Sequence, residues 1–129
     1  MQFGNLFNLQ KLDLGANQLR GGIPAEFGNL SDLQVLSLHN NHLSGRIPTQ
    51  IGNLTSLLVL YVYSNQLSGA LPVELTALTS LEEFYFDDTL LCEPDQQSFR
   101  DWLATLSIVF RSDLICGATS PLFLPLILF

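Results

Sequence analysis

The chain has 129 residues, of which 47% are hydrophobic and 13% are charged, so its composition excludes a disordered protein and its length suits one domain. Five Lys and Arg against twelve Asp and Glu give a net charge of -7. This balance argues against nucleic acid as a partner, because phosphates need basic side chains, whereas it permits a basic protein or peptide.

From Leu6 onward the sequence repeats with a period of 24 residues. Segments 6–29, 30–53 and 54–77 share the pattern LxxLxxLxLxxNxLxGx(I/L)P. A fixed period of this kind indicates a solenoid, in which each coil covers the core of the next. The pattern resembles the leucine-rich repeat family, in the form with the LSGxIP signature typical of plant receptor-like proteins. The resemblance covers residues 1–91 and implies an α/β solenoid that is curved, with a parallel β-sheet on its concave face.

The chain opens inside an earlier copy of the repeat, because residues 3–5, FGN, match residues 27–29. We therefore expect a C-terminal piece of a longer protein, or a gene model that begins at an internal methionine. The first residues have neither the basic start nor the apolar run of a signal peptide. In a fragment, this says little about the cellular compartment.

Each copy is expected to lead from an amphipathic convex segment into a short strand. Around Leu36 and Leu38, alternation turns these two leucines inward and their neighbours outward. The equivalent inward pairs are Leu12/Leu14, Leu60/Val62 and Phe84/Phe86. The asparagines that follow can satisfy backbone groups of their own and the neighbouring turn; they are Asn17, Asn41 and Asn65. The LxGxIP segments predict a second extended piece, in which three more leucines continue the core: Leu19, Leu43 and Leu67.

The fourth copy starts at Leu78 and breaks down, because Thr89 replaces the expected Asn and the GxIP segment is missing. Such an atypical copy is expected at the end of a solenoid. Residues 94–106 then predict a helix that begins near Pro94 and covers the exposed end of the core. One apolar stripe supports this prediction; its residues are Phe99, Trp102, Leu103 and Leu106.

Two cysteines can staple one loop but cannot build a disulfide scaffold. The stretch DDTLLCEP, followed by FxxWL and a later Cys, resembles the C-terminal cap of some repeat proteins of this family. The resemblance implies a disulfide between Cys92 and Cys116, and two free thiols in a reducing compartment are the alternative. We therefore divide the chain into repeats over 1–91 (the tail of one copy, three full copies and one degenerate copy), a cap over 92–118, and a tail over 119–129.

The tail ends in PLFLPLILF from Pro121 to Phe129, which is apolar but shorter than the roughly 20 residues that span a bilayer as a helix. A truncated membrane segment, the end of a lipid-anchor signal and a disordered or misread terminus all remain open. Membrane attachment is therefore expected only through missing or truncated segments.

The outward positions of successive strands form rows that gather aromatic and aliphatic side chains, bordered by acids on the C-terminal side. An apolar patch with tyrosines and a charged rim is typical of a protein interface, although aromatic residues also favour strands for their own sake. The predicted ligand-binding residues are Val35, His39, Leu58, Val59, Tyr61, Tyr63, Tyr85 and Asp87.

No catalytic constellation, cofactor motif or metal-ligand set is recognisable, and His39 and His42 alone do not make a metal site. Asn29 and Asn53 are each the first residue of an N-glycosylation acceptor, at the same position of successive copies. The family resemblance implies a non-enzymatic module that binds a protein or peptide, part of an extracellular receptor-like or secreted recognition protein. A structural scaffold and an inhibitor of a secreted hydrolase are the alternatives, and any kinase domain lies outside this sequence.

Overall fold

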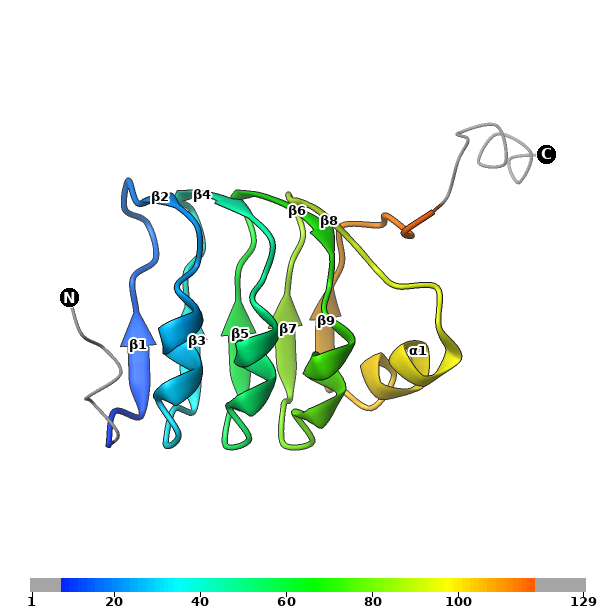
Figure 1. Ribbon diagram of the computed structural model, residues 1–129, viewed down its shortest axis with the longest axis horizontal. Helices are drawn as coiled ribbons and strands as arrows, with labels where there is room; N and C mark the ends of the chain where they lie inside the picture. Colours follow the sequence, from blue (N-terminus) through cyan, green and yellow to red (C-terminus); the bar gives the residue numbers. More distant parts are fainter. Residues whose placement is uncertain (1–7, 118–129) are drawn as a thin grey trace.

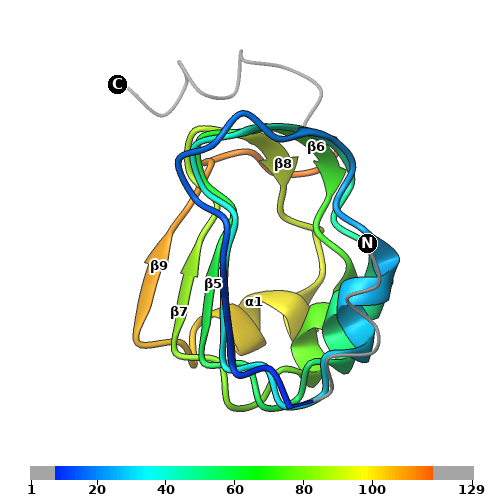
Figure 2. The same cartoon turned by 90° about the vertical axis from the view of Figure 1, so that its left-hand side faces the viewer.

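The computed structural model describes residues 8–117, which form a stack of similar coils (Figure 1). Predictions for residues 3–5 and 119–129 lie outside this range. Each coil runs along a first sheet, turns, and passes along a second sheet. Three coils then return through a short 3-10 helix on the side opposite the first sheet (Figure 2).

The first sheet consists of parallel strands that lie side by side in chain order (Figure 1). Its strands are β1 (Lys11–Asp13), β3 (Val35–Ser37), β5 (Val59–Tyr61), β7 (Glu83–Tyr85) and β9 (Ile108–Phe110). The register places Leu36 beside Leu12 and Leu60 beside Leu36, so equivalent positions of successive repeats become neighbours. The predicted inward pairs are confirmed, since all of them are buried except Leu14, which is half-buried.

Strand β9 was not predicted, because it follows the helix of the cap and has no copy elsewhere in the sequence. It pairs with β7 in parallel, so that Ile108 lies beside Glu83 and Phe110 beside Tyr85. Its sequence, IVF, is β-branched and aromatic, which suits a strand. The cap therefore extends the first sheet as well as covering the core.

The second sheet contains β2 (Arg20–Gly21), β4 (His42–Gly45), β6 (Gln66–Ala70) and β8 (Leu90–Cys92). Buried asparagines join neighbouring coils between the two sheets. Asn65 donates from Nδ2 to the Leu38 and Val62 carbonyls at 2.9 and 3.1 Å. Its Oδ1 accepts from the Leu43 amide at 3.0 Å. Asn41 makes the equivalent contacts one coil earlier, which confirms the structural role predicted for Asn41 and Asn65. Asn17 is exposed, and its described side-chain hydrogen bonds reach the Leu14 and Gly15 carbonyls of its own turn.

Thr89, at the Asn position of the last coil, donates to the Phe86 carbonyl at 2.7 Å. It accepts from the Leu91 amide at 3.3 Å, so the hydrogen bonds described for its side chain stay inside its own turn. The residue before each of these turn positions is left-handed, which bends the chain from one sheet to the other. These residues are Ala16, Asn40, Ser64 and Asp88, with φ of 57°, 56°, 56° and 54°.

The 3-10 helices each follow a repeat proline and stack on one another; they are η2 (Ala25–Asn29), η3 (Thr49–Asn53) and η4 (Val73–Ala77). Close stacking depends on glycine. A Cβ on Gly28 would overlap the carbonyl oxygen of Gln50, and a Cβ on Gly52 would overlap that of Glu74. The equivalent residue of η4 is Thr76, and η4 packs against the cap helix instead of a further 3-10 helix.

The cap helix α1 spans Gln97–Leu103 and is shorter than predicted. The expectation that it begins near Pro94 was wrong, because the Gln96 amide bonds to the Pro94 carbonyl in a turn and Gln96 itself is extended. The predicted apolar stripe is buried throughout. Trp102 also donates from Nε1 to the Leu78 carbonyl at 3.1 Å, so it ties the cap to the last repeat as a packing residue.

Cys92 and Cys116 form a disulfide with their Cα atoms 4.9 Å apart. Beside it, the Glu93 amide donates to the Leu114 carbonyl and the Glu93 carbonyl accepts from the Cys116 amide. The Glu93 side chain is buried and lies 3.6 Å from Arg111, measured from Oε2 to Nε. Burial raises the pKa of this carboxyl, and Arg111 opposes the shift.

Candidate functional site

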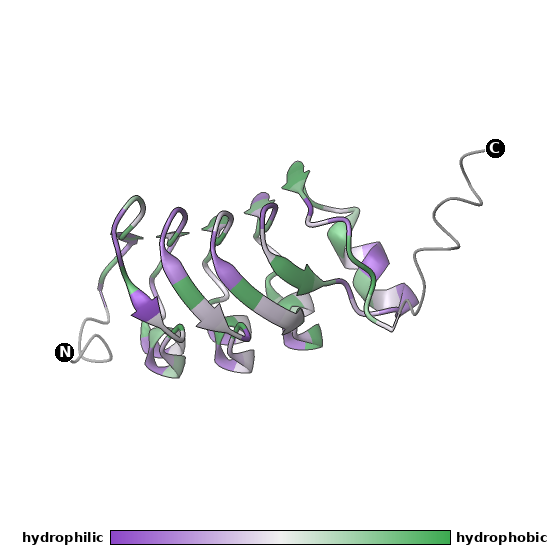
Figure 3. Ribbon diagram, turned by 90° about the horizontal axis from the view of Figure 1, so that it is seen from above, coloured by the Kyte–Doolittle hydropathy of each residue, from purple (hydrophilic) through white to green (hydrophobic). Residues whose placement is uncertain are grey.

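The outward face of the first sheet, called the concave face below, carries its side chains in rows that cross the strands. One row runs through Val35, Val59, Glu83 and Ile108, and the next runs through Ser37, Tyr61, Tyr85 and Phe110. In Figure 3, β1 is largely hydrophilic and β9 is hydrophobic throughout. Between them, the outward valines and tyrosines share the face with the acidic Glu83 of β7.

Five rings form one continuous aromatic cluster on this face, which comprises His39, Tyr61, Tyr63, Tyr85 and Phe110. Tyr85 stacks between Tyr61 and Phe110, with centroids 4.4 Å apart on both sides. His39 stacks on Tyr63 at 4.8 Å, with ring planes inclined by 12°. An edge contact of 5.9 Å between Tyr61 and Tyr63 joins the two stacks. Neighbouring strands lie about 4.8 Å apart, a spacing that suits ring stacking.

Phe110 was missed at the sequence level, although it completes the stack and is 52% exposed. The signal that could have found it is the short β-branched and aromatic run Ile108–Phe110. That stretch lies beyond the repeats, where no periodicity marks a strand.

His39 is fixed in its place by two neighbours. Its ring covers Gly15, where a Cβ would overlap the ring. Its Nδ1 lies 2.7 Å from Oγ of Ser37, and Ser37 is buried although it faces outward. The aromatic cluster thus begins from a constrained position just after β3.

Tyr61 donates from its hydroxyl to Oε1 of Glu83 at 2.6 Å. This hydrogen bond, together with burial, raises the pKa of Tyr61 well above its usual range. Tyr61 therefore presents a neutral ring and a fixed hydroxyl over the physiological range.

Other predicted residues surround the cluster at different distances from its centre. Val35 and Val59 lie in the adjacent row and are half-buried. Leu58 precedes β5 and lies at the margin of the sheet, also half-buried. Asp87 is half-buried too, and its Oδ1 is buried without a hydrogen-bond partner in the part of the chain that the structure describes.

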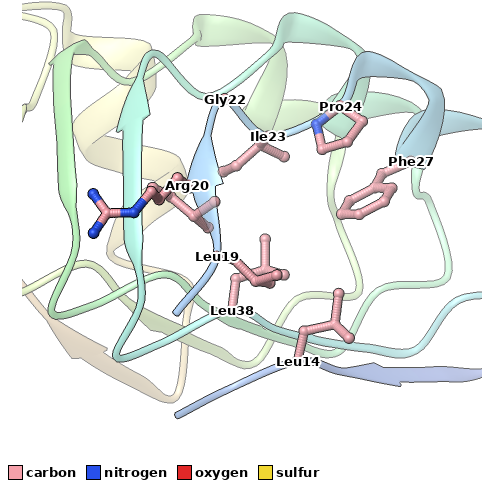
Figure 4. Close-up of a pocket in the computed structure, with 9 residues that line it drawn as sticks. Leu14, Leu19, Arg20, Gly22, Ile23, Pro24, Phe27 and Leu38 are labelled. Atoms are coloured by element: carbon pink, nitrogen blue, oxygen red, sulfur yellow. The ribbon is translucent and has the colours of Figure 1, made fainter. Parts of the chain in front are cut away.

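A separate apolar pocket of about 440 Å³ lies at the N-terminal end of the described stack (Figure 4). Leu14, Leu19, Ile23 and Phe27 contribute to its lining. The expectation that Leu19 belongs to the core was wrong, since it is 38% exposed, whereas its counterpart Leu43 in the next coil is buried. The pocket is thus lined by core positions of the first two described coils, none of which belongs to the aromatic cluster.

Asn29 and Asn53 end η2 and η3 and are exposed, on the side opposite the first sheet (Figure 2). Glycans there would leave the concave face free. Across residues 8–117 there is no group of three or more His, Cys, Asp or Glu that could hold a metal ion. No helix within the same range is long and apolar enough to cross a membrane.

A family model described as leucine-rich repeat region matches residues 1–107. No curated protein matches the chain. Among solved structures, the ectodomain of the receptor kinase SOBIR1 from Arabidopsis thaliana is 31% identical, with a TM-score of 0.75 over 85% of this chain. The plant peptide hormone receptor RGFR1 in complex with RGF2 is 37% identical, with a TM-score of 0.77 over 84% of this chain.

The Arabidopsis receptor kinase HAESA, in complex with the peptide hormone IDA and the co-receptor SERK1, is 34% identical over 84% of this chain, with a TM-score of 0.74. The chain spans 60% of the SOBIR1 structure, 17% of the RGFR1 structure and 18% of the HAESA structure.

Proposed function

The chain belongs to the leucine-rich repeat family, and from that premise we propose that it is a non-catalytic module that binds a protein or peptide. We place the ligand across the concave face and the module in an extracellular receptor-like or secreted recognition protein. The solved structures of RGFR1 and HAESA, both complexes with peptide hormones, support this proposal. The disulfide between Cys92 and Cys116 supports an oxidising compartment.

The aromatic cluster is the observation that carries the proposal. Stacked tyrosines offer large contact area, little conformational freedom to lose and polar tips for hydrogen bonds. The stack of Tyr61, Tyr85 and Phe110 crosses β5, β7 and β9, so an extended ligand that runs across the strands would meet one ring per strand. The acids beside the cluster favour a ligand with basic residues.

A selection of short random peptides from a display library, with the folded chain as target, tests this proposal. Peptides that bind the wild type are then measured against Tyr61→Ala and Tyr85→Ala, one variant at a time. We expect each variant to weaken binding by about tenfold or more, because truncation of a central interface aromatic costs about 2 kcal/mol.

Leu90→Ala is the matched control, because Leu90 is a 66% exposed apolar residue on β8 of the second sheet. Circular dichroism and thermal unfolding of each variant verify the fold. Equal binding by the wild type and both tyrosine variants would place the ligand elsewhere and defeat the proposal.

A further inference from the structure

A third row of the concave face runs past the ends of the strands through Gly15, His39, Tyr63 and Asp87. Backbone hydrogen bonds define it, since Asn40 donates to the Tyr63 carbonyl and Ser64 donates to the Asp87 carbonyl, both at 3.1 Å. His39 stacks on one side of Tyr63. The next residue of the row is the carboxylate Asp87, while the rings of Tyr61 and Tyr85 meet Tyr63 only at an angle, with centroids 5.9 Å away and planes inclined by 64° and 48°.

The Asp87 carboxylate lacks a donor for one of its oxygens. Oδ1 is buried and has no hydrogen-bond partner among residues 8–117. Two donors of the following coil are engaged elsewhere: Arg111 pairs with Glu93, and Ser112 donates to the Leu91 carbonyl. A buried carboxylate oxygen without a donor is costly, and native proteins usually pair such an atom.

The residue next to Asp87, Asp88, is a second carboxylate and is exposed. Glu83 lies in another row of the same face, where it accepts the Tyr61 hydroxyl at 2.6 Å. Lys11, a basic residue of this face, lies on β1 at the opposite edge of the sheet. A donor that carries a positive charge would suit this pair of adjacent carboxylates best.

We propose that Asp87 and Tyr63 form a seat for one arginine side chain of the ligand. The guanidinium stacks on the face of Tyr63 turned away from His39 and donates to the Asp87 carboxylate. Arginine fits this seat better than lysine, because its planar group stacks on an aromatic ring while its N–H groups donate to a neighbouring carboxylate. The inference rests on the proposed function, since it names one side chain of a ligand that crosses the concave face.

The peptide selection described above tests this seat through the composition of the peptides that bind. Separate selections use the wild type, Asp87→Ala and Asp32→Ala, where Asp32 is an exposed aspartate outside both sheets. Asp87→Asn is avoided, because Asp88 and Thr89 follow and the change would create a glycosylation acceptor. We expect arginine to be enriched with the wild type and Asp32→Ala, and the enrichment to vanish with Asp87→Ala.

One selected peptide then enters a double-mutant cycle in which citrulline, a neutral isostere, replaces its arginine. On the wild type we expect the replacement to weaken binding by about tenfold, as for a lost stacking and ion-pair contact. On Asp87→Ala the same replacement should change affinity by less than about twofold, because the coupled partner is absent. On Tyr63→Leu, replacement of arginine by citrulline should weaken binding by a factor between these two values.

The outcomes separate this inference from the proposed function. If selected peptides depend on Tyr85 but show no arginine enrichment, or keep it with Asp87→Ala, the seat is refuted and concave-face binding stands. Enrichment of lysine to the same extent as arginine also refutes a guanidinium seat. If no selected peptide depends on Tyr61 or Tyr85, both the proposed function and the seat fail.

Discussion

The hydroxyl of Tyr61 donates a hydrogen bond of 2.6 Å to Oε1 of Glu83, its diagonal neighbour on strand β7. Tyr61→Phe should lower the free energy of unfolding by about 1 kcal/mol, the usual net contribution of such a bond. Chemical denaturation measures the change. Tyr63→Phe is the matched control, because the structure describes no hydrogen bond of the Tyr63 hydroxyl within residues 8–117, and it should leave stability unchanged.

The same bond predicts a pH dependence. The folded state raises the pKa of Tyr61, so the neutral phenol is favoured by folding. This contribution is fully present below the usual tyrosine value of about 10 and is lost as pH rises above it. Unfolding curves of the wild type between neutral and alkaline pH should therefore lose more stability than those of Tyr61→Phe. Parallel curves would contradict the prediction.

Gly52→Ala should lower the free energy of unfolding by about 1–3 kcal/mol, the usual range for overpacking. The reason is the overlap of a Cβ at this position with the carbonyl oxygen of Glu74 in the next coil. Thermal or urea unfolding measures the loss. Thr76→Ala, at the equivalent position of η4, should change stability by less than about 0.5–1 kcal/mol, and an equal loss in both variants would disprove the stacking argument.

Asp87→Ala should raise the stability of the free protein by about 1 kcal/mol, because it removes a buried carboxylate oxygen without a donor. The same change should remove the preference for arginine among the selected peptides. A residue that lowers stability and serves binding is expected at a functional site. A destabilised Asp87→Ala variant would show that the carboxylate has a structural partner instead.

Burial raises the pKa of the Glu93 carboxyl, so the folded state favours its protonated form. This contribution to stability is fully present below the ordinary value of 4.5 and is lost as pH rises above it. Glu93→Gln should therefore flatten the stability profile between acid and neutral pH. Glu74→Gln, which changes an exposed carboxylate, is the control and should keep the slope of the wild type.

Reduction of the disulfide between Cys92 and Cys116 should lower stability by on the order of 3 kcal/mol, the entropic value for a closed loop of this size. The double variant Cys92→Ser, Cys116→Ser should unfold at the same denaturant concentration as the reduced wild type. Mass spectrometry of the native protein before and after alkylation measures the thiol state. Full alkylation without reductant would contradict the bridge.

The repeat period predicted what recurs, because stacking places equivalent residues of successive copies side by side. Leu36 lies between Leu12 and Leu60 for this reason, and the ladder of Asn41 and Asn65 follows from the same spacing. Features that occur only once in the chain could not be predicted from the period. Strand β9 has no copy to compare with, and the start of α1 depends on the turn between Pro94 and Gln96.

The candidate site likewise has features that the repeat period predicted and features that it did not. Row positions predicted that Tyr61 and Tyr85 are neighbours, since both follow from the period. Three other features depend on side-chain packing among several coils. They are the rotamers that stack the two tyrosine rings, the burial of Ser37 beside His39, and the missing donor at Asp87. Pattern alone carries no information about these, and Phe110 entered the cluster only through the unexpected strand.

Thr76 determines where an additional coil could be inserted into the stack of repeats. Gly28 and Gly52 accept a further coil against their backbone, whereas Thr76 carries a side chain at the same place and meets helix α1. A duplicated unit inserted ahead of residue 54 would find a compatible neighbour on each side. The same unit inserted after residue 77 would meet a threonine where glycine is required. The length of this protein can therefore change by evolution or by engineering at its interior junctions, while the junction with the cap stays closed to insertion.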